Sequence, residues 1–412
     1  MTIARPSLRF DFANAPGFID PRGTFARAST GVYTDRLGVL RTAAASTPRW
    51  DYDPITGLSR GVLFEPQRTN LFLRARELDN AAWAKSGTTV TANTSAAADG
   101  TAALETIAAT AAGGYVAQAC AITAGNAVTI SVYARASTTS HLLLSLTDGV
   151  NGVLCWFNIL AGTVTTNTAG AGTVLFAFKD IEACGNGLQR CSLTVTTSGI
   201  TAITAVIAPA AADGVGTSIG DTIFAGDAQF EAPGATATHA SSFIATSSTA
   251  VTRSGAYLSV PTSGSWFNTT EGTMVFDFLV SRRTPTNSLV FGGTGDTFSN
   301  TIYLSRSSMS VFMTVISSGT QQALIGKTLD WTIGARNRVA MAWRANDFAI
   351  VANGGTPALD TNGALPVGPV RLMVGAAPYS ATGGTNCCEA ISQVAYFPRR
   401  MADSVMQTLT AP

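Results

Sequence analysis

The sequence predicts an all-β protein, and three observations support this class. Charged residues make up only 12% of the 412 residues while hydrophobic residues make up 46%, and Gly, Ala, Ser and Thr are abundant. Such a composition is typical of short strands whose solvent faces carry hydroxyl groups. Apolar residues alternate with a period of two in many segments, and turn signals separate those segments. We therefore predict an N-terminal hairpin-rich attachment segment followed by two antiparallel β-sandwiches.

Residues 1–75 are dense in turn signals, among them "DPRG", "DRLG" and "DYDPITG". The pieces between these turns are each long enough for one strand of a hairpin. A segment of this kind has little core of its own. We expect it to pack against a neighbouring part of the chain or against another copy.

The N-terminal segment also carries most of the charge asymmetry. Residues 1–76 contain eleven Arg, no Lys and six acids, a net of +5, so the rest of this chain of net charge +1 sums to −4. The arginines are interspersed with acids and aromatics instead of forming a run, which favours a protein interface over nucleic acid. We expect planar pairing of guanidinium groups with carboxylates and carbonyls there.

Residues 76–250 show repeated period-two patterns that predict eight or so sandwich strands. The apolar residues expected on one face are Val128, Ile130 and Val132; Val174, Phe176 and Phe178; and Cys191, Leu193 and Val195. Apart from one helical turn near residues 80–93, we expect little helix in this segment.

Residues 251–412 predict a second sandwich. The stretch "EGTMVFDFLVSR" is largely apolar on both faces, which indicates a central strand, and "NRVAMAWRANDFAIVANGG" indicates a hairpin that turns at "RAND". The tail "FPRRMADSVMQTLT" predicts a short closing helix with Asp403 near its start.

Six cysteines fit no metal-binding spacing, and we expect no metal or other cofactor. In "EACGNGLQRCSL" the Gly-Asn-Gly turn would bring Cys184 and Cys191 face to face, so they are the one candidate disulfide. The N-terminus lacks the apolar core of a signal peptide, and no uninterrupted run of 18 apolar residues occurs. We therefore expect no membrane insertion.

Catalytic motifs are not evident. His141 and His239 stand alone, no GxSxG sequence occurs, and the glycine-rich "FGGTGDTF" has no following Lys to make a phosphate loop. Its Asp296 could contribute to a Ca²⁺ site, although a turn is the better interpretation. The most serious enzymatic option is a pair of carboxylates for glycoside hydrolysis, for which the candidates are Glu231, Glu271 and Asp277. We nevertheless predict that the protein is not an enzyme.

Aromatic residues offer a different function, because sugar-binding sandwiches stack pyranose rings on exposed aromatic side chains. The candidate glycan contacts are Trp83, Trp156 and Trp266, and Trp331 is a further candidate.

Specific stretches resemble known families. "RASTGVYTDRLGVLRTAAASTPRWDYDPITGLSRGVLFEPQRTNL", residues 27–71, resembles the N-terminal signature of bacteriophage structural proteins of the tail-fibre and virion-decoration kind. Residues 76–250 are similar to a carbohydrate-binding-module-like jelly roll, which extends into "GDAQFEAPGATATHASSFIATSSTAVTR". Residues 251–412 resemble a concanavalin A-like (laminin G-type) lectin sandwich through "EGT", "NGG" and the closing "FPRRMADSVMQTLT".

The resemblance implies a virion protein that is assembled in the host cytoplasm and exposed on the particle surface. It would dock through residues 1–75 to capsid, collar or tail proteins, associate with itself as a homotrimer, and bind host glycans through its sandwiches. The attachment residues that we predict are Arg27, Tyr33, Arg36, Arg49, Trp50, Asp51, Glu65, Arg68 and Asn70.

The stretch "GVLFEPQRTNL" concentrates charge in a chain that otherwise has little. We predict that Glu65 and Arg68 form a buried ion pair, with Asn70 satisfying nearby backbone groups, which fixes the segment against the first sandwich. The alternative is an ordinary surface turn with solvated charges.

Two other functions remain open from the sequence. One is a glycan-degrading depolymerase, although no long β-helix repeat is visible. The other is a purely structural capsid or tail decoration that binds no ligand.

Overall fold

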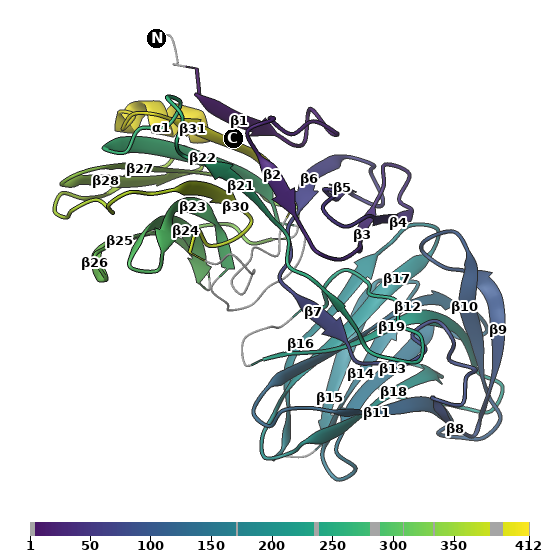
Figure 1. The fold of residues 1–412 in the computed structure, drawn as a ribbon. Coiled ribbons are helices and arrows are strands. Elements are labelled where there is room, and N and C mark those ends of the chain that lie inside the picture. The colour runs from purple at the N-terminus through teal and green to yellow at the C-terminus, as the bar shows by residue number, and fades with distance from the viewer. Residues whose placement is uncertain are drawn as a thin grey trace.

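The computed structural model describes residues 5–169, 172–234, 239–280, 289–307, 309–332, 334–379 and 390–411. In these residues the chain is built almost entirely of β-strands, and one short helix, α1 (Asp403–Thr410), follows the last strand. The predicted all-β class is confirmed. Figure 1 shows two lobes that meet at a narrow region, which we call the waist.

The lobe drawn at the lower right of Figure 1 is the jelly roll, made of two six-stranded antiparallel sheets. The strand order of the first sheet is β16 (Val174–Ala183), β17 (Leu188–Thr197), β12 (Ala127–Ala136), β19 (Thr222–Gly234), β10 (Ala102–Ala109) and β9 (Thr88–Ala96). The order of the second is β15 (Thr163–Ala169), β14 (Gly152–Asn158), β13 (His141–Thr147), β18 (Ala202–Ala210), β11 (Tyr115–Ala121) and β8 (Ala84–Ser86).

Alternation places one face of each jelly-roll strand in the core, as the sequence predicted for β12 and β17. The prediction for β16 is wrong in part, because Val174 is buried but Phe176 is 38% exposed and Phe178 is only partly buried. The pairing of β16 with β17 shifts register between Phe176 and Phe178. A bulge on this edge strand therefore turns the aromatic side chains away from the core.

The other lobe is the C-terminal sandwich. One sheet has the order β29 (Ala358–Asp360), β28 (Asp347–Ala352), β27 (Arg336–Arg344), β22 (Glu271–Leu279), β31 (Ala390–Phe397), β6 (Ser59–Leu63) and β5 (Trp50–Tyr52), and β1 (Leu8–Asp11) also pairs with β31. The second has the order β2 (Thr24–Ala26), β21 (Tyr257–Pro261), β30 (Arg371–Val374), β23 (Leu289–Thr297), β24 (Asn300–Ser307), β25 (Ser310–Ser317) and β26 (Thr320–Thr328).

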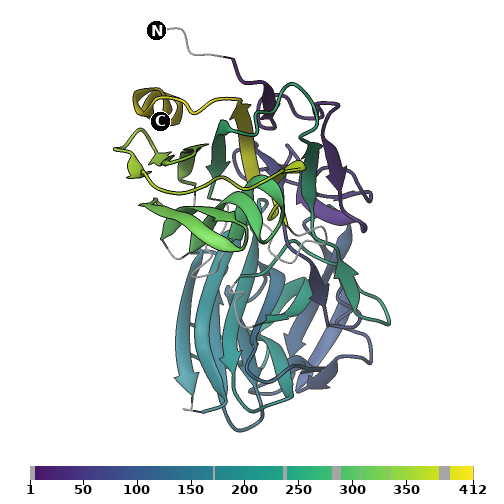
Figure 2. The ribbon, with the colours of Figure 1, turned by 60° about the vertical axis from the view of Figure 1, so that its left-hand side comes forward.

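Strands from both ends of the chain build this lobe. From residues 1–75, β1 and β6 pair with β31, and β2 pairs with β21. The same segment contributes Phe10, Phe12, Phe25 and Phe64 to the core of the C-terminal sandwich. The neighbour on which the N-terminal segment packs is thus another part of the same chain. In the turned view of Figure 2, its strands and the C-terminal strands sit together above the jelly roll.

The waist is crossed by β7 (Arg68–Asn70), which enters the jelly roll, and by β20 (Val251–Arg253), which leaves it, and these two strands pair with each other. Beside them lies the hairpin of β3 (Gly31–Thr34) and β4 (Leu40–Ala43). The backbone N–H of Leu40 donates to the Ala98 carbonyl of the jelly roll. The N-terminal segment therefore contacts both lobes.

Several predicted elements of the C-terminal sandwich are confirmed. Strand β22 lies centrally between β27 and β31, and β27 and β28 form the predicted hairpin with Arg344 opposite Asp347. Helix α1 begins at the predicted Asp403. Within the described ranges, we find no helix with the length and apolar character needed to cross a membrane.

Candidate functional site

The buried charges of the waist meet at Glu65, whose side chain is 1% exposed. Its Oε2 accepts a hydrogen bond from Arg49 Nη1 at 2.5 Å and lies 3.2 Å from Arg253 Nη1. Ser242 donates to the same carboxylate from its backbone N at 2.8 Å and from its Oγ at 2.6 Å. We call these four residues the waist node. Because they come from the N-terminal segment, β20 and the chain after β19, the node fastens the N-terminal segment to the exit of the jelly roll.

The prediction that Glu65 is buried and ion-paired is confirmed, but its predicted partner Arg68 is wrong. Arg68 is half-buried and donates to the Gln67 carbonyl at 2.9 Å. Strand β7 places Arg68 opposite Arg253, and it is Arg253 that reaches the carboxylate. Arg253, on the neighbouring strand β20, is therefore the partner of Glu65 in place of Arg68, which lies three residues from Glu65 in the sequence.

Asn70 has the backbone-satisfying role that the sequence predicted. Its Nδ2 donates to the carbonyls of Ala228 and Ile244 at 3.1 and 2.8 Å. Its Oδ1 accepts from the backbone N–H groups of Phe72 and Phe230. All the hydrogen-bonding groups of this fully buried amide are used to join β7 to the jelly roll.

Arg27, also predicted as an interface residue, is 1% exposed and is satisfied by backbone oxygens. It donates to the carbonyls of Ser29, Ala44 and Thr47. Burial, together with the charge of neighbouring Arg49, lowers the pKa of Arg27 to about 10. Arg27 therefore closes the β4–β5 connection by carbonyl contacts instead of by an ion pair.

The remaining predicted attachment residues lie around the waist. Arg36 is exposed, Trp50 is half-buried against Phe12, and Tyr33 and Asp51 line a pocket between the hairpins and the jelly roll. Contact of any of these residues with another protein stays a prediction.

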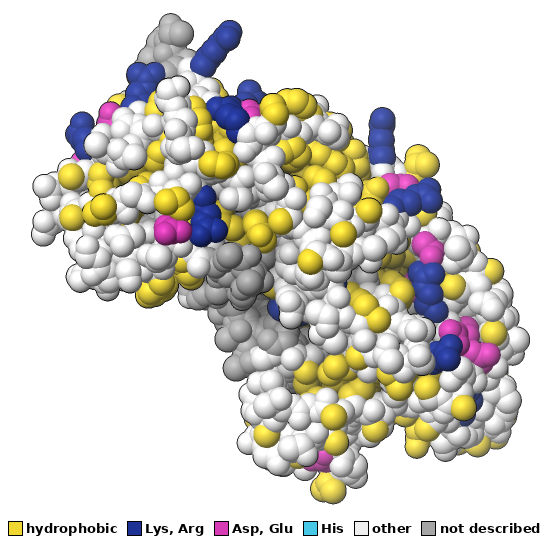
Figure 3. All heavy atoms as spheres, in the orientation of Figure 1, with side chains coloured by type: hydrophobic (Ala, Val, Ile, Leu, Met, Phe, Trp, Pro, Cys, Tyr) yellow, Lys and Arg dark blue, Asp and Glu magenta, His cyan; other side chains and the backbone are white. Residues whose placement is uncertain are grey.

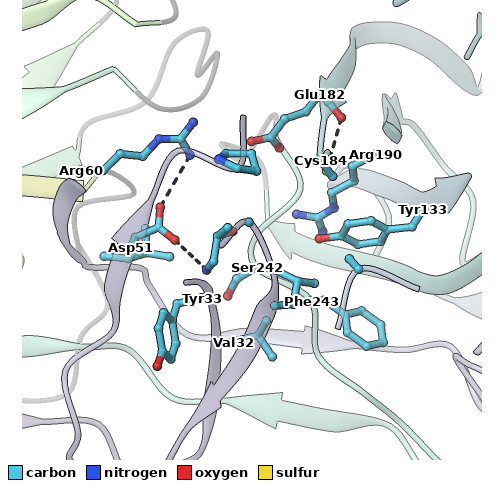
Figure 4. A pocket seen from close by; sticks show the side chains of 16 residues that line it. Val32, Tyr33, Asp51, Arg60, Tyr133, Glu182, Cys184, Arg190, Ser242 and Phe243 are labelled. Carbon is cyan, nitrogen blue, oxygen red and sulfur yellow. Dashed lines mark hydrogen bonds and ion pairs between the residues drawn. The ribbon is translucent and has the colours of Figure 1, made fainter. Parts of the chain in front are cut away.

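The waist pocket is drawn in Figure 4. The N-terminal hairpins contribute Asp51 and Arg60, whose charged groups lie 3.6 Å apart, and the jelly roll contributes Arg190, whose guanidinium lies 5.3 Å from the centre of the Tyr133 ring. The space left inside is about 30 Å³, which is room for about two water molecules. The pocket is too small for a sugar ring and is a small gap in the interface between the N-terminal segment and the jelly roll.

The predicted disulfide between Cys184 and Cys191 is wrong, and both residues are thiols. Cys191 pairs with Ile181 across the two strands, and its side chain points into the jelly-roll core. The backbone N–H of Cys184 donates to the carbonyl of Leu188, and the side chain of Cys184 lines the waist pocket. The two sulfurs therefore lie on opposite faces of one strand pair, where a bridge cannot form.

Two of the predicted glycan contacts are wrong because they are buried. Trp83 is 1% exposed and Trp156 is 4% exposed, and their indole N–H groups donate to the backbone carbonyls of Arg74 and Val215 respectively. Trp331 is also buried. Trp266 is half-buried with its ring edge-on to Tyr396, so a glycan contact there stays a prediction.

The carboxylates considered for catalysis are engaged by other groups. Glu231 is 1% exposed and accepts from the N and Oγ of Ser241. Asp277 accepts from Arg336 at 2.7 Å and from Arg338 at 2.9 Å. Glu271 accepts from the backbone N of Arg400.

Asp296 lies 3.0 Å from Arg371 as an ion pair near the end of β23. Among the described residues, no group of three or more His, Cys, Asp or Glu side chains is placed to hold a metal ion.

The C-terminal sandwich carries a partly exposed group of rings that the sequence did not single out. Phe298 is 59% exposed, and its ring centre lies 5.1 Å from that of Tyr379, which lies 5.7 Å from that of Tyr303. Both contacts are edge-to-face. Tyr303 points outward because Ile302 and Leu304, its neighbours on β24, face the core. We call Phe298, Tyr303 and Tyr379 the aromatic cluster.

A glycine-rich strand and an ion pair lie beside the aromatic cluster. On β23, Gly293 pairs with Tyr303, and Gly295 pairs with Arg371. The glycines leave β23 without side chains at these two positions. Arg371 and its partner Asp296 are 28% and 44% exposed, so charged donors and acceptors are available next to the rings.

The site residues predicted from the sequence do not include Phe298, Arg253, Ser242 or Tyr379, and only the first two of these have a recognisable sequence signal. Phe298 falls in the two-residue connection between β23 and β24, and an aromatic residue in a tight turn is seldom buried. Arg253 is the one charged residue in the hydroxyl-rich connector "SSTAVTRSG". No local pattern distinguishes Ser242 or Tyr379.

Two buried carboxyl groups of the jelly roll have pKa values raised by burial. Burial, with a hydrogen bond to Asp79, raises the pKa of Glu105 to about 8. Burial also raises the pKa of Asp227 to about 7, although Arg76 lies 2.7 Å away, and the charge of Asp99 on the same arginine adds to the effect.

Comparison with known proteins finds no matching family model and no matching curated protein. Among solved structures, the chain is similar to the CBM40 module of the Ruminococcus gnavus IT-sialidase bound to α2,3-sialyllactose, with 16% identity over 35% of this chain and 84% of that chain and a TM-score of 0.31. A leech intramolecular trans-sialidase has 13% identity over 35% of this chain and 23% of that chain, with a TM-score of 0.30. A SAP-like pentraxin from Limulus polyphemus has 10% identity over 34% and 70%, with a TM-score of 0.27. These likenesses are too distant to assign a function.

Proposed function

We propose that this chain is a non-enzymatic glycan-binding protein and that the aromatic cluster is its binding site. The observation that carries the proposal is the exposure of Phe298 beside Tyr379 and Tyr303, next to the ion pair of Asp296 and Arg371. Aromatic rings pack against the apolar C–H face of a pyranose, and charged side chains hydrogen-bond its hydroxyl groups. Exposed aromatic side chains that gather at one place on a protein surface often mark a binding site.

The carboxylates weighed for catalysis favour binding over hydrolysis. Glu231 is buried under Ser241, and Asp277 is held between two arginines, so neither presents a carboxyl group that could protonate or attack a glycosidic bond. A glycan depolymerase is therefore the less supported function.

Binding can be tested by a glycan array followed by titration calorimetry on the strongest ligand. We expect Phe298→Ala to weaken that ligand by about tenfold, which corresponds to the loss of about 1.4 kcal/mol of ring contact. Phe18→Ala is the matched control, because Phe18 is an equally exposed phenylalanine (61%) on the N-terminal segment. It should leave the affinity unchanged.

A blank array, or equal loss of affinity in the Phe298 and Phe18 variants, would refute binding at the aromatic cluster. Release of oligosaccharide from a bound glycan during the titration would favour the depolymerase instead.

We also propose that the protein acts on the surface of a virus particle. The support for this location is the resemblance of residues 27–71 to bacteriophage structural proteins. In this proposal the chain is a fibre, spike or decoration on the particle surface and associates as a homotrimer. Antibodies against the chain should label intact particles in electron micrographs, and light scattering should give the mass of three chains. Unlabelled particles would remove the virion role and leave glycan binding untouched.

A further inference from the structure

A groove lies on the outer face of the sheet that contains β22 and β31, and residues of helix α1 and strand β1 also line it. Figure 1 shows α1 and β1 at the same end of this lobe. Its floor is formed by the apolar Val275, Ala395 and Phe397 and by the polar Asp277 and Gln393, with Leu409 of α1 on one side and Arg9 of β1 on the other. Arg9 and Val275 both pair with Ala395, so their side chains share the outer face. The groove encloses about 360 Å³, far more than the 30 Å³ of the waist pocket.

The width of the groove matches one α-helix. Helix α1 packs on β27 and β28, where Val405 and Met406 cover Ala340 and Ala342. Two strands, β22 and β31, then lie between α1 and β1. At about 4.8 Å per strand they span roughly 10 Å, the diameter of a helix with its side chains. A second helix could therefore lie beside α1, over Val275 and Ala395.

The rim of the groove has an excess of positive charge. Arg9 pairs with Asp11, while Arg336 and Arg338 share the single carboxylate of Asp277. Three guanidinium groups thus face two carboxylates, and the side chains of Arg9 and Arg336 are each 51% exposed. Figure 3 shows several dark blue side chains at the top of this lobe, where Figure 1 places β1 and α1.

We propose that this groove binds an acidic amphipathic helix of a partner protein. The apolar stripe of the helix, at spacings of three and four residues, would cover Val275, Ala395 and Leu409. Its carboxylates would meet the guanidinium groups of Arg9 and Arg338. Within the described residues, Arg9 donates through Nη2 and Arg338 through Nε and Nη1, so each keeps other N–H groups for a ligand. Charge complementarity sets the choice of partner, because a basic helix would be repelled by the same rim.

The proposal can be tested on the full chain with a labelled synthetic peptide of about 15 residues that carries leucines on one face and glutamates beside them. We expect saturable fluorescence anisotropy that weakens at high salt. Arg9→Glu should weaken binding at least about tenfold, and Leu409→Gln about fivefold.

Arg41→Glu is the matched control for Arg9→Glu. Arg41 pairs with Asp35, and the side-chain exposures of 51% and 20% nearly equal the 51% and 22% of Arg9 and Asp11. This variant should bind the peptide as the unaltered chain does.

Three results would overturn the proposal. The first is equal binding of a peptide with lysines in place of the glutamates, and the second is no effect of Arg9→Glu. The third is no binding of the acidic peptide together with binding of vesicles that contain phosphatidylglycerol, which would assign the groove to a lipid surface.

Discussion

The waist and the outer surface of the C-terminal sandwich use side chains in opposite ways. In the waist, Glu65, Arg49 and Arg253 are at most 2% exposed and hold one another in a low-dielectric interior. On the outer surface, Phe298 is 59% exposed, and the nearby pair of Asp296 and Arg371 is solvated. One region hides charge and the other exposes apolar rings.

This difference in burial indicates that the waist and the outer surface have different roles. A buried ion pair adds little net stability compared with a well-packed apolar alternative, but removing one partner is costly, so it specifies which segments meet. An exposed aromatic group adds little to folding, and where several gather they often mark a binding surface, which is the role proposed for the aromatic cluster. The waist therefore fixes the arrangement of the lobes, and the outer surface is available for binding.

The largest effect is expected at the waist node. Glu65→Gln keeps the shape of the side chain but removes the carboxylate that Arg49 and Arg253 share, so that Arg253 keeps only the more distant charge of Glu231. We expect the free energy of unfolding to fall by about 3–5 kcal/mol, measured by urea denaturation. Removing Phe298 should change the same quantity by no more than about 0.5 kcal/mol, which would sharpen the contrast between the two regions.

Arg68→Ala provides the control for the waist. Arg68 is near Glu65 in the sequence but pairs with the Gln67 carbonyl at the surface, so its loss should cost less than about 1 kcal/mol. Similar destabilisation by the Glu65 and Arg68 variants would mean that the node does not hold the lobes together.

Much of the fold could be predicted from the sequence because its signals are local. The alternation of Val128, Ile130 and Val132 describes a half-buried strand wherever that strand lies. The hairpin of β27 and β28 is likewise encoded in one continuous stretch. The lack of a core in residues 1–75 predicted that they need a neighbour, but the pairing of β1 and β6 with β31 joins residues more than 300 positions apart.

The site was less predictable because its contacts are not local. Glu65 was correctly expected to be buried and paired, yet Arg49 and Arg253 lie 16 and 188 positions from it, and no local spacing favours them over Arg68. Trp83 and Trp156 were chosen by residue type, and type does not reveal burial. Phe298 and Tyr379 meet only after β23, β24 and β30 have assembled.

A smaller effect is expected from the buried carboxyl groups of the jelly roll, which extend the comparison to pH. The folded chain raises the pKa of Glu105 to about 8 and that of Asp227 to about 7, whereas in the unfolded chain both would lie near 4. The folded state therefore holds more protons than the unfolded state between about pH 4 and pH 8. Its stability rises as the pH falls through this window and declines as the pH rises through the folded pKa values.

Lowered pKa values limit this trend on the acid side. Hydrogen bonds and nearby arginines lower the pKa of Asp20 and Asp35, and the stability they contribute is lost as the pH falls below about 4. We therefore expect the melting temperature to be highest near pH 5 and to fall as the pH rises from 5 to 8. Thermal melts at matched ionic strength measure this directly.

Glu105→Gln separates the buried carboxyl group from the rest of the titration. The amide mimics the protonated acid, and its oxygen can still accept from the backbone N of Asp79. The variant should melt higher than the unaltered chain near pH 8 and at the same temperature near pH 5. Asp213→Asn is the control, because this surface carboxylate accepts from Thr165 at an exposed site and should leave the slope unchanged. If both variants follow the unaltered chain at every pH, buried charge in the jelly roll does not govern its stability, and the contrast would hold only at the waist.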